Sequence, residues 1–310
     1  MTEQTTKDII IIGGGTAGMT AALYALRAGN TIEIFENYVH GGQIIVSHEV
    51  ENYPALPGIT GADFAIKLFE QVEKLGMNMR YETINQVDLE GNPKTVTTNK
   101  GTYAAQTVII ATGSMRKTLK VKGESKFSGR GVSYCATCDG AFHQGKPVAV
   151  VGGGNTALED AIFLAKTSSV VYLINRESDF SGDDLLIETV QATPNIEILR
   201  QSQVMEIKGD QMVTGISVMD AAANTIRTLT VSGVFIAVGV APNSNLFEGI
   251  LNIDDKGYLI AGEDCHTNLP GVYAAGDCRT KGLRQLVTAA ADGAVAATEA
   301  NRYIIKKRRG

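Results

Sequence analysis

The sequence predicts an α/β fold made of two similar units, because one pattern of strand, glycine-rich turn and helix occurs twice in 310 residues. The first copy begins near residue 8 and the second near residue 147. A chain of this length corresponds to about two domains, and its 44% hydrophobic residues can fill two cores. The duplication therefore predicts both the fold class and the domain number.

In the first copy, four consecutive isoleucines predict a buried parallel strand. Gly13, Gly15 and Gly18 follow in Gly-x-Gly-x-x-Gly spacing, and a helix is predicted over 19–28. Such glycines permit a tight turn, close approach of the backbone to a pyrophosphate, and close packing of helix on strand. Phosphates then bind the N–H groups of the helix N-terminus. Glu36 ends the next strand and can accept hydrogen bonds from ribose hydroxyls, so this unit is predicted to bind a dinucleotide.

The second copy has a predicted strand over 147–151, a glycine turn, a helix over 158–166 and a strand over 170–174. Ala157 takes the third glycine position, which the pattern allows. Two dinucleotide folds imply two dinucleotides, and the usual pair is a flavin and a nicotinamide. A second unit kept only for packing is the alternative. The nucleotide contacts predicted here are Gly152, Gly154, Asn155, Thr156, Arg176 and Glu177.

A pair of cysteines, Cys135 and Cys138, comes just before the second copy and is followed by Asp139. If a helical turn begins at Ala136, the first thiol lies near its N-terminus, where partial positive charge favours the thiolate. Thiols at this spacing can close and reopen a disulfide by exchange. Asp139 can supply and remove the proton that this reaction needs. The pair is therefore predicted to be a redox dithiol.

Zinc is the main alternative for these cysteines, because four cysteines and one Cys-x-x-Cys pair are present. However, Cys265 and Cys278 do not form a second such pair and are expected to be small buried apolar residues. The histidines also show no ligand spacing, so no metal site is predicted. They are His40, His48, His143 and His266.

Charge and hydropathy exclude several classes of function. The net charge of −5 argues against nucleic-acid binding, and the basic run over 306–309 is expected to be a solvated terminus. No apolar stretch approaches the ~20 residues that span a bilayer, and the polar start does not resemble a secretory signal. A cytoplasmic protein is therefore expected, and there a Cys-x-x-Cys pair indicates redox work or metal binding.

Over essentially its full length the chain resembles the low-molecular-weight thioredoxin reductases. The most specific landmark is the run Cys-Ala-Thr-Cys-Asp over 135–139, which lies between the two glycine patterns. The other landmarks are Gly41-Gly42-Gln43, Glu51-Asn52-Tyr53-Pro54, Ala111-Thr112-Gly113, Gly276-Asp277 and Arg284-Gln285.

The resemblance implies two Rossmann-like dinucleotide-binding domains of the three-layer ββα type, the second inserted into the first. It implies an FAD domain over 1–116 and 245–310, a nicotinamide domain with the dithiol over 117–244, and a homodimer. The inserted domain would swing during turnover, about hinges near Arg116-Lys117 and Val240–Asn245.

The resemblance also implies roles for single residues. Cys138 would be the thiol beside the flavin, Cys135 the thiol that attacks the partner disulfide, and Asp139 the proton donor. Glu36 would bind the adenosine ribose. The implied flavin contacts are Gly13, Gly15, Gly18, Glu36, Gln43, Asn52, Gly113, Gly276, Asp277 and Gln285.

The sequence departs from the family pattern after the second nucleotide strand. NADPH-using members have His-Arg-Arg-x-x-x-Arg there, whereas residues 175–181 read Asn-Arg-Glu-Ser-Asp-Phe-Ser, so only Arg176 matches. Glu177 and Ser181 remove two cations that would bind a 2′-phosphate. Losing such contacts at about 1.5–3 kcal/mol each costs at least about tenfold in NADPH affinity. Three donors remain: NADH read by Glu177 or Asn175, NADPH bound weakly through Arg176, or ferredoxin or another flavin-reducing protein.

The leading prediction is an enzyme that passes electrons from NADH or NADPH through FAD and the dithiol to thioredoxin or a thioredoxin-like protein. A ferredoxin–nicotinamide reductase of similar architecture is disfavoured, because those enzymes lack a dithiol at this place. A dithiol oxidase would use the same cysteines with oxygen as acceptor to oxidise a small molecule. A non-enzymatic zinc- or nucleotide-binding regulatory module would carry no flavin and would be colourless.

Overall fold

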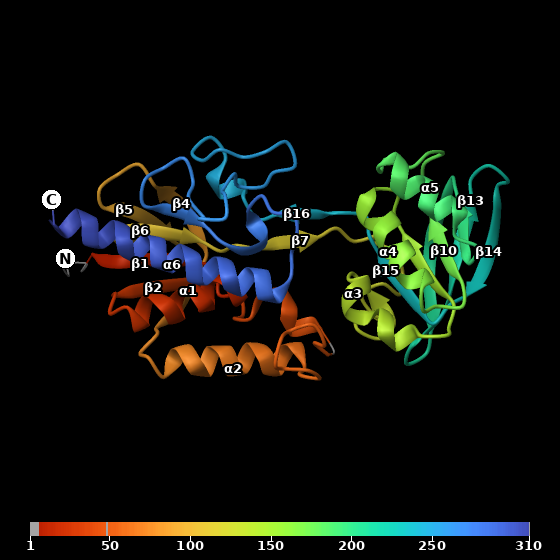
Figure 1. Cartoon of the computed structure of the whole chain (residues 1–310), viewed down its shortest axis with the longest axis horizontal. Helices are drawn as coiled ribbons and strands as arrows, with labels where there is room; N and C mark the ends of the chain where they lie inside the picture. Colours follow the sequence, from red (N-terminus) through yellow and green to blue (C-terminus); the bar gives the residue numbers. More distant parts are fainter. Residues whose placement is uncertain (1–5, 48, 310) are drawn as a thin grey trace. The chain divides into compact units, whose positions relative to one another are not determined.

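The computed structural model describes residues 6–47 and 49–309. Met1–Met115 with Ala241–Gly310 form one compact unit, and Arg116–Val240 form the other. The chain passes between the units twice, through strands β7 (Ser114–Arg116) and β16 (Val240–Pro242), which pair in a two-stranded sheet (Figure 1). Of the four histidines, His48 lies outside the described residues.

The first unit contains a seven-stranded sheet in the order β3-β2-β1-β6-β5-β4, and β17 also pairs with β6. Strands β1, β2, β3 and β17 run parallel to their neighbours, while β4, β5 and β6 form an antiparallel meander. The strand bounds are β1 (Lys7–Ile12), β2 (Ile32–Glu36), β3 (Met79–Tyr81), β4 (Ile84–Asp88), β5 (Lys94–Thr98), β6 (Thr102–Ile110) and β17 (Val272–Ala274).

The isoleucine run is buried because β1 lies between two cores. Ile9 and Ile11 pack into one core with the helices, and Ile10 and Ile12 pack into a second core on the other face of the sheet. A strand buried on both faces needs apolar residues at successive positions, which explains the absence of alternation. The helices of this unit are α1 (Thr16–Arg27), α2 (Gly61–Glu73) and α6 (Leu286–Arg309).

The last helix includes the basic run that was expected to be a solvated terminus, because α6 continues to Arg309. Its basic end is not only solvated, because Lys307 hydrogen-bonds Asn92 and Arg308 forms an ion pair with Asp8. Helix α1 likewise begins at Thr16 rather than at residue 19, directly after the glycine turn.

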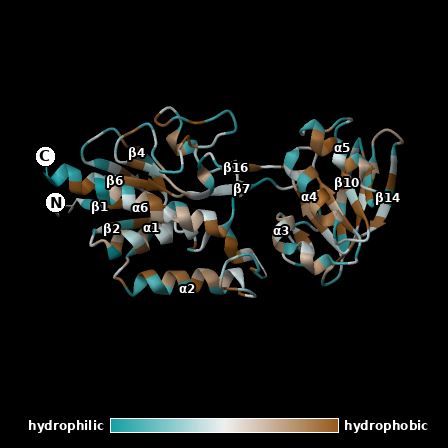
Figure 2. Ribbon diagram, viewed as in Figure 1, coloured by the Kyte–Doolittle hydropathy of each residue, from teal (hydrophilic) through white to brown (hydrophobic). Residues whose placement is uncertain are grey.

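The second unit has three layers. A parallel sheet in the order β11-β10-β9-β15-β8 has helices on one face and the antiparallel sheet β12-β13-β14 on the other. Figure 2 shows apolar residues in the strands of this unit, including β10. Its elements are β8 (Val132–Ser133), α3 (Ala136–Asp139), β9 (Val148–Val151), α4 (Asn155–Ala165), β10 (Val171–Ile174), α5 (Asp184–Ala192), β11 (Ile196–Leu199), β12 (Ser202–Gly209), β13 (Val213–Asp220), β14 (Thr225–Thr230) and β15 (Gly233–Ile236).

Short 3-10 turns complete the described part of the chain: η1 (Gly42–Val46), η2 (Gly140–His143), η3 (Asn245–Phe247) and η4 (Gly276–Cys278). The predicted α/β fold class is confirmed. Among the described residues, no helix has the length and apolar character to cross a membrane.

Candidate active site

The first glycine turn has the geometry that its spacing predicts. Gly13 has φ +110°, and a Cβ there would lie 2.3 Å from the carbonyl oxygen of Ala111. A Cβ at Gly18 would lie 1.8 Å from the carbonyl oxygen of Gly13, so α1 packs directly on the turn. Gly15 caps α1 without a side chain, and no acidic residue lies in the first turn of the helix. These features fit a dinucleotide pyrophosphate at this helix end.

Glu36 is fixed at the end of β2 by backbone N–H groups. Its Oε2 accepts a hydrogen bond from Gly14 N at 2.8 Å, and its Oε1 accepts from Asn37 N and Tyr38 N at 2.8 and 3.1 Å. Three backbone N–H donors hold the carboxylate in this orientation. The acid therefore stands beside the glycine turn, as its predicted role with a ribose requires.

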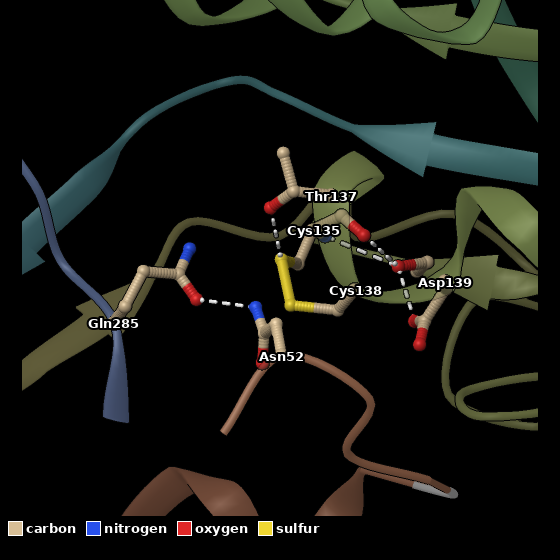
Figure 3. Close-up of a disulfide and its surroundings, with 7 residues drawn as sticks. Asn52, Cys135, Thr137, Cys138, Asp139 and Gln285 are labelled. Carbon is tan, nitrogen blue, oxygen red and sulfur yellow. Dashed lines mark hydrogen bonds between the residues drawn. A yellow bond between two sulfur atoms is a disulfide. The ribbon is translucent and has the colours of Figure 1, made fainter. Parts of the chain in front are cut away.

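Further expected flavin contacts are joined by hydrogen bonds within the first unit. Gly41 N donates to Gly14 O at 2.8 Å, which places the Gly41-Gly42-Gln43 segment on the turn. The Gln43 side chain donates to Ser114 O. Asn52 Nδ2 donates to Gln285 Oε1 at 3.0 Å, although the two residues are 233 positions apart (Figure 3).

The Gly276-Asp277 turn is held by a residue that sequence reasoning missed. Gly276 has φ +79°, and its N–H donates to Asp292 Oδ2 at 2.8 Å. Arg279 and Lys281 also bind the Asp292 carboxylate, each at 2.8 Å. Burial by itself raises the pKa of Asp292, but the hydrogen bonds from Arg279 and Lys281 outweigh it and hold the pKa below its usual value. The sequence signal for this role was the position of Asp292, an acidic residue among the alanines near the start of α6.

The other strand-end turn of this unit is tied across the chain. Gly113 has φ +66°, and its carbonyl accepts from Asn243 N at 3.0 Å. Thr112 Oγ1 donates to Asn243 O at 2.7 Å, and Asn243 Nδ2 donates to Thr112 O at 3.0 Å. The expected flavin contact Gly113 therefore lies where the returning chain meets the outgoing one.

The second glycine turn repeats the first. Gly152 has φ +151°, and a Cβ there would lie 2.3 Å from Ala237 O and 2.8 Å from the Ala157 Cβ. Ala157 is fully buried, which explains why the third position tolerates a methyl group but little more. Gly154 caps α4 without a side-chain hydrogen bond, so the fit to a pyrophosphate is similar to that of α1.

The side chain of Asn175 is hydrogen-bonded to the backbone of the loop that follows β10. It is buried, its Nδ2 donates to Asp179 O at 2.8 Å, and its Oδ1 accepts from Glu177 N at 3.3 Å. A Cβ at Gly153 would lie 2.4 Å from that Oδ1. Because both ends of the amide bind backbone, Glu177 is the better candidate to read ribose hydroxyls.

The segment beyond β10 contains an ion pair at the position of the NADPH pattern. Arg176 Nη2 lies 3.0 Å from Glu177 Oε1, and the two side chains are 77% and 68% exposed. The single cation that matches the NADPH pattern is thus paired with a carboxylate. At the start of α4, Asn155 Nδ2 donates to Asp183 Oδ2 and Asp183 N donates to Asn155 Oδ1, each at 2.8 Å. Thr156 is exposed beside them.

The cysteine pair forms a disulfide on the turn that the sequence predicts. Cys135 and Cys138 are bonded with Cα atoms 5.3 Å apart, and Cys135 caps the four-residue helix α3 (Figure 3). Cys135 O accepts from Cys138 N at 3.3 Å and from Asp139 N at 3.1 Å. Thr137 Oγ1 lies 3.4 Å from Cys135 Sγ. The dithiol therefore sits in a short, internally bonded loop.

Two neighbours of the dithiol were not predicted. Ser133 Oγ donates to Asp139 Oδ2 at 2.6 Å and accepts from Cys135 N at 3.1 Å. Tyr134 OH donates to Glu124 Oε1 at 2.8 Å, and burial followed by this hydrogen bond raises the pKa of Tyr134. The only sequence signal was the position of Ser133 and Tyr134 directly before the first cysteine.

The other two cysteines are not part of this chemistry. Cys265 and Cys278 are fully buried free thiols, as expected. Burial raises the pKa of Cys265 to about 12 and that of Cys278 to about 11, so both stay protonated at neutral pH. In the described ranges no group of three or more His, Cys, Asp or Glu side chains is arranged to hold a metal ion.

Two nucleotide-type units and one dithiol define a disulfide oxidoreductase of the dinucleotide-dependent class. The sequence model of the pyridine nucleotide-disulphide oxidoreductase family matches residues 7–293. The chain belongs to this family and is an oxidoreductase.

Relatives and solved structures agree with this assignment. A thioredoxin reductase of Mycolicibacterium smegmatis is 40% identical over 308 residues, which cover 99% of each chain. The crystal structure of thioredoxin reductase from Streptococcus pyogenes has a TM-score of 0.94 and 36% identity, over 98% of this chain and 100% of that one. A ferredoxin-flavin thioredoxin reductase from Clostridium acetobutylicum has a TM-score of 0.53 and 32% identity, over 98% and 99%.

Proposed function

We propose that this protein is a thioredoxin-disulfide reductase that transfers electrons from a soluble donor to the disulfide of thioredoxin or a thioredoxin-like protein. The observation that carries the proposal is the Cys135–Cys138 disulfide at the start of α3, with the Asp139 carboxylate hydrogen-bonded beside it. Family membership over most of the chain supports the reaction class. Relatives named thioredoxin reductase support the acceptor.

FAD is the cofactor proposed for the first unit, which extends over 1–115 and 241–310. The turn at Gly13 would hold the pyrophosphate, and Glu36 would bind the adenosine ribose. Gln43, Asn52, Gly113, Asp277 and Gln285 would lie against the flavin portion. A flavin bound there would supply the two-electron transfer between the donor and the disulfide. The second unit, over 116–240, would bind the nicotinamide nucleotide at Gly152 and Gly154.

The residues of the chain then complete the exchange with the acceptor. Cys135 attacks a sulfur of the acceptor disulfide, which forms a mixed disulfide and releases one acceptor thiolate. Cys138 gives its proton to Asp139, attacks Cys135 Sγ and releases the second acceptor thiolate. The enzyme disulfide forms while the acceptor is reduced by two electrons.

NADH is the donor that the second unit favours. Arg176 is paired with Glu177. Ser181 carries no charge, and its N–H and hydroxyl both donate to Gly153 O. This segment therefore offers no unpaired cation to a 2′-phosphate. Reduced ferredoxin is the second candidate donor. It is favoured by the likeness to a ferredoxin-flavin thioredoxin reductase together with these missing cations. A homodimer is proposed from the family resemblance alone.

One anaerobic experiment tests the proposed function. The oxidised flavoprotein is mixed with NADH, NADPH or reduced ferredoxin, and flavin bleaching and the appearance of two thiols per chain are followed. Thioredoxin is then added, and its reduction is measured by insulin turbidity.

We expect NADH to bleach the flavin faster than NADPH, and thioredoxin to be reduced. If reduced ferredoxin bleaches the flavin and neither nicotinamide does, ferredoxin is the donor in place of NADH. A colourless protein, or a yellow protein whose dithiol never appears with any donor, would contradict the proposed function. The variant Cys138→Ser is the control, because it keeps the flavin unit and cannot close the disulfide.

A further inference from the structure

The hydroxyl of Ser133 connects the two parts of the dithiol loop that must act together. Ser133 is 5% exposed and ends β8. It accepts a hydrogen bond from Cys135 N at 3.1 Å and donates one to Asp139 Oδ2 at 2.6 Å. A hydroxyl has one proton, and a carboxylate 2.6 Å away is a stronger acceptor than Cys135 O at 3.3 Å. The donated bond therefore goes to Asp139.

The backbone of Ser133 is fixed independently of the dithiol. Strand β8 pairs in parallel with β15, with Ser133 opposite Phe235 and Val132 opposite Val234. Val132, Val234 and Phe235 are all buried. The hydroxyl is therefore presented from a sheet, whereas Asp139 ends a four-residue helix that contains Cys138 and leads into a 3-10 turn. In this arrangement the sheet can position the carboxylate, and the carboxylate cannot easily position the sheet.

The histidine that follows Asp139 does not take the place of Ser133. Ser133 Oγ hydrogen-bonds the Asp139 carboxylate directly. His143 follows in η2, but its Nδ1 is 3.0 Å from Ser232 Oγ. Burial lowers the pKa of His143, Lys146 lowers it further, and Asp139 only opposes this shift. A neutral imidazole bonded to Ser232 is a poor candidate for the proton carrier.

We propose that Ser133 is a positioning residue of the redox reaction, which holds the Asp139 carboxylate in place to take the proton of Cys138 when the disulfide closes. The proposal rests on the proposed role of Asp139 as proton carrier. Without the hydroxyl, the half-buried carboxylate loses its fixed partner and has to find the same orientation by rotation. The closure step becomes slower as a result. The first attack by Cys135 does not require the Asp139 carboxylate to be held in place.

The closure step can be measured without any electron donor. The protein is reduced with dithiothreitol, freed of it and mixed with the aromatic disulfide DTNB in a stopped-flow instrument. Cys135 attacks one DTNB sulfur and releases one thionitrobenzoate. Cys138 then loses its proton to Asp139, attacks Cys135 Sγ and releases the second thionitrobenzoate. Two thiols lose two electrons and one DTNB gains them, and Cys265 and Cys278 stay silent because they are buried.

Three variants separate positioning from simple structural support. Ser133→Ala is expected to slow the second phase by about tenfold, a small part of the 10²–10⁴-fold typical of general acid–base catalysis, and to leave the first phase within about twofold. Ser133→Thr keeps the hydroxyl and is expected to restore the second phase. Ser202→Ala is the matched control. Ser202 begins β12 of the antiparallel sheet and is as buried as Ser133, but its hydroxyl donates to Arg200 O. Urea unfolding of all variants shows whether each one folds.

The double variant gives the sharpest outcome. In an Asp139→Asn background, adding Ser133→Ala is expected to slow closure by less than about twofold, because Ser133 acts through the missing carboxylate. A further tenfold loss in that background, or Ser133→Ala closing as fast as the wild type, overturns the proposal. A wild-type protein that never releases the second thionitrobenzoate contradicts the proposed function itself, and the Ser133 proposal with it.

Discussion

Gly293 of α6 lies directly against the backbone of Ala17 in α1. A Cβ at Gly293 would be 2.2 Å from the carbonyl oxygen of Ala17 and 2.9 Å from Ala21 N. Ala17 in turn lies next to the Gly276 turn, where an added Cβ would be 2.9 Å from the Ala17 Cβ. The two helices therefore meet backbone to backbone beside the glycine turn of the first unit.

This contact reverses the usual effect of removing a helix glycine. Gly→Ala inside a helix normally stabilises by about 1 kcal/mol. Here we expect Gly293→Ala to destabilise by about 2 kcal/mol or more, because α6 must move away from α1. Urea unfolding measures the change. Gly101→Ala is the control, since a Cβ there meets nothing within 4 Å and should be nearly neutral. Equal midpoints for both variants would contradict the close approach.

Glu36 should decide how tightly the first unit holds the proposed FAD. Glu36→Gln weakens the hydrogen bond from Gly14 N and removes the charge offered to a ribose. We expect about a tenfold loss of FAD affinity, which is about 1.4 kcal/mol. Equilibrium dialysis followed by the flavin spectrum measures it. Glu90→Gln on an exposed hairpin is the control. Full FAD retention by Glu36→Ala would remove Glu36 from the site.

Nucleotide preference should follow the charges after β10. The variant Glu177→Ala releases Arg176 from its 3.0 Å ion pair, and Ser181→Arg adds the missing cation. Together they should raise the ratio of kcat/KM for NADPH to that for NADH by at least about tenfold, because each new charge-assisted contact contributes about 1.5–3 kcal/mol. Steady-state kinetics with both nucleotides give the ratio. An unchanged ratio would show that the second unit does not discriminate through this segment.

Asp160 on α4 should make the protein less stable at higher pH. Burial and then the neighbouring Glu159 raise its pKa from 3.8 to about 7. A raised pKa in the folded state means that the stability contribution is complete below about pH 4 and is lost as the pH rises through about 7. We expect Asp160→Asn to stabilise the folded protein by about 2 kcal/mol at pH 8. This is about half of the free energy that the full change in pKa would give, because solvent screens the partly exposed carboxylate.

The two-pH comparison also provides the test. Urea unfolding of Asp160→Asn and wild type should coincide at pH 4 and separate at pH 8. Glu188→Gln, an exposed acid on α5, is the control and should show no such separation. A variant less stable than wild type at pH 8 would contradict the predicted sign.

Features with a fixed local spacing could be read from the sequence. The glycines at 13, 15 and 18 can be recognised because the turn, the helix start and the strand contact all lie within six residues. The Cys135–Cys138 loop is predictable for the same reason, as is the burial of the isoleucine run. Local spacing did not reveal how Asn175 is used. Its amide was a candidate to bind ribose, whereas in the structure it donates to Asp179 O and accepts from Glu177 N.

The sequence by itself therefore determined the class of fold, the two glycine turns and the cysteine pair. Tertiary structure alone decided which groups support them: Asp292 beneath Gly276, Gln285 on Asn52 and Glu124 on Tyr134. The physical reason is that a turn depends on the backbone angles of a few neighbouring residues. A hydrogen bond between distant residues depends on the path of the whole chain. Ser133 and Asp139 lie between these cases. Only six positions separate them, but the pairing of β8 with β15 holds Ser133 where its hydroxyl reaches the Asp139 carboxylate.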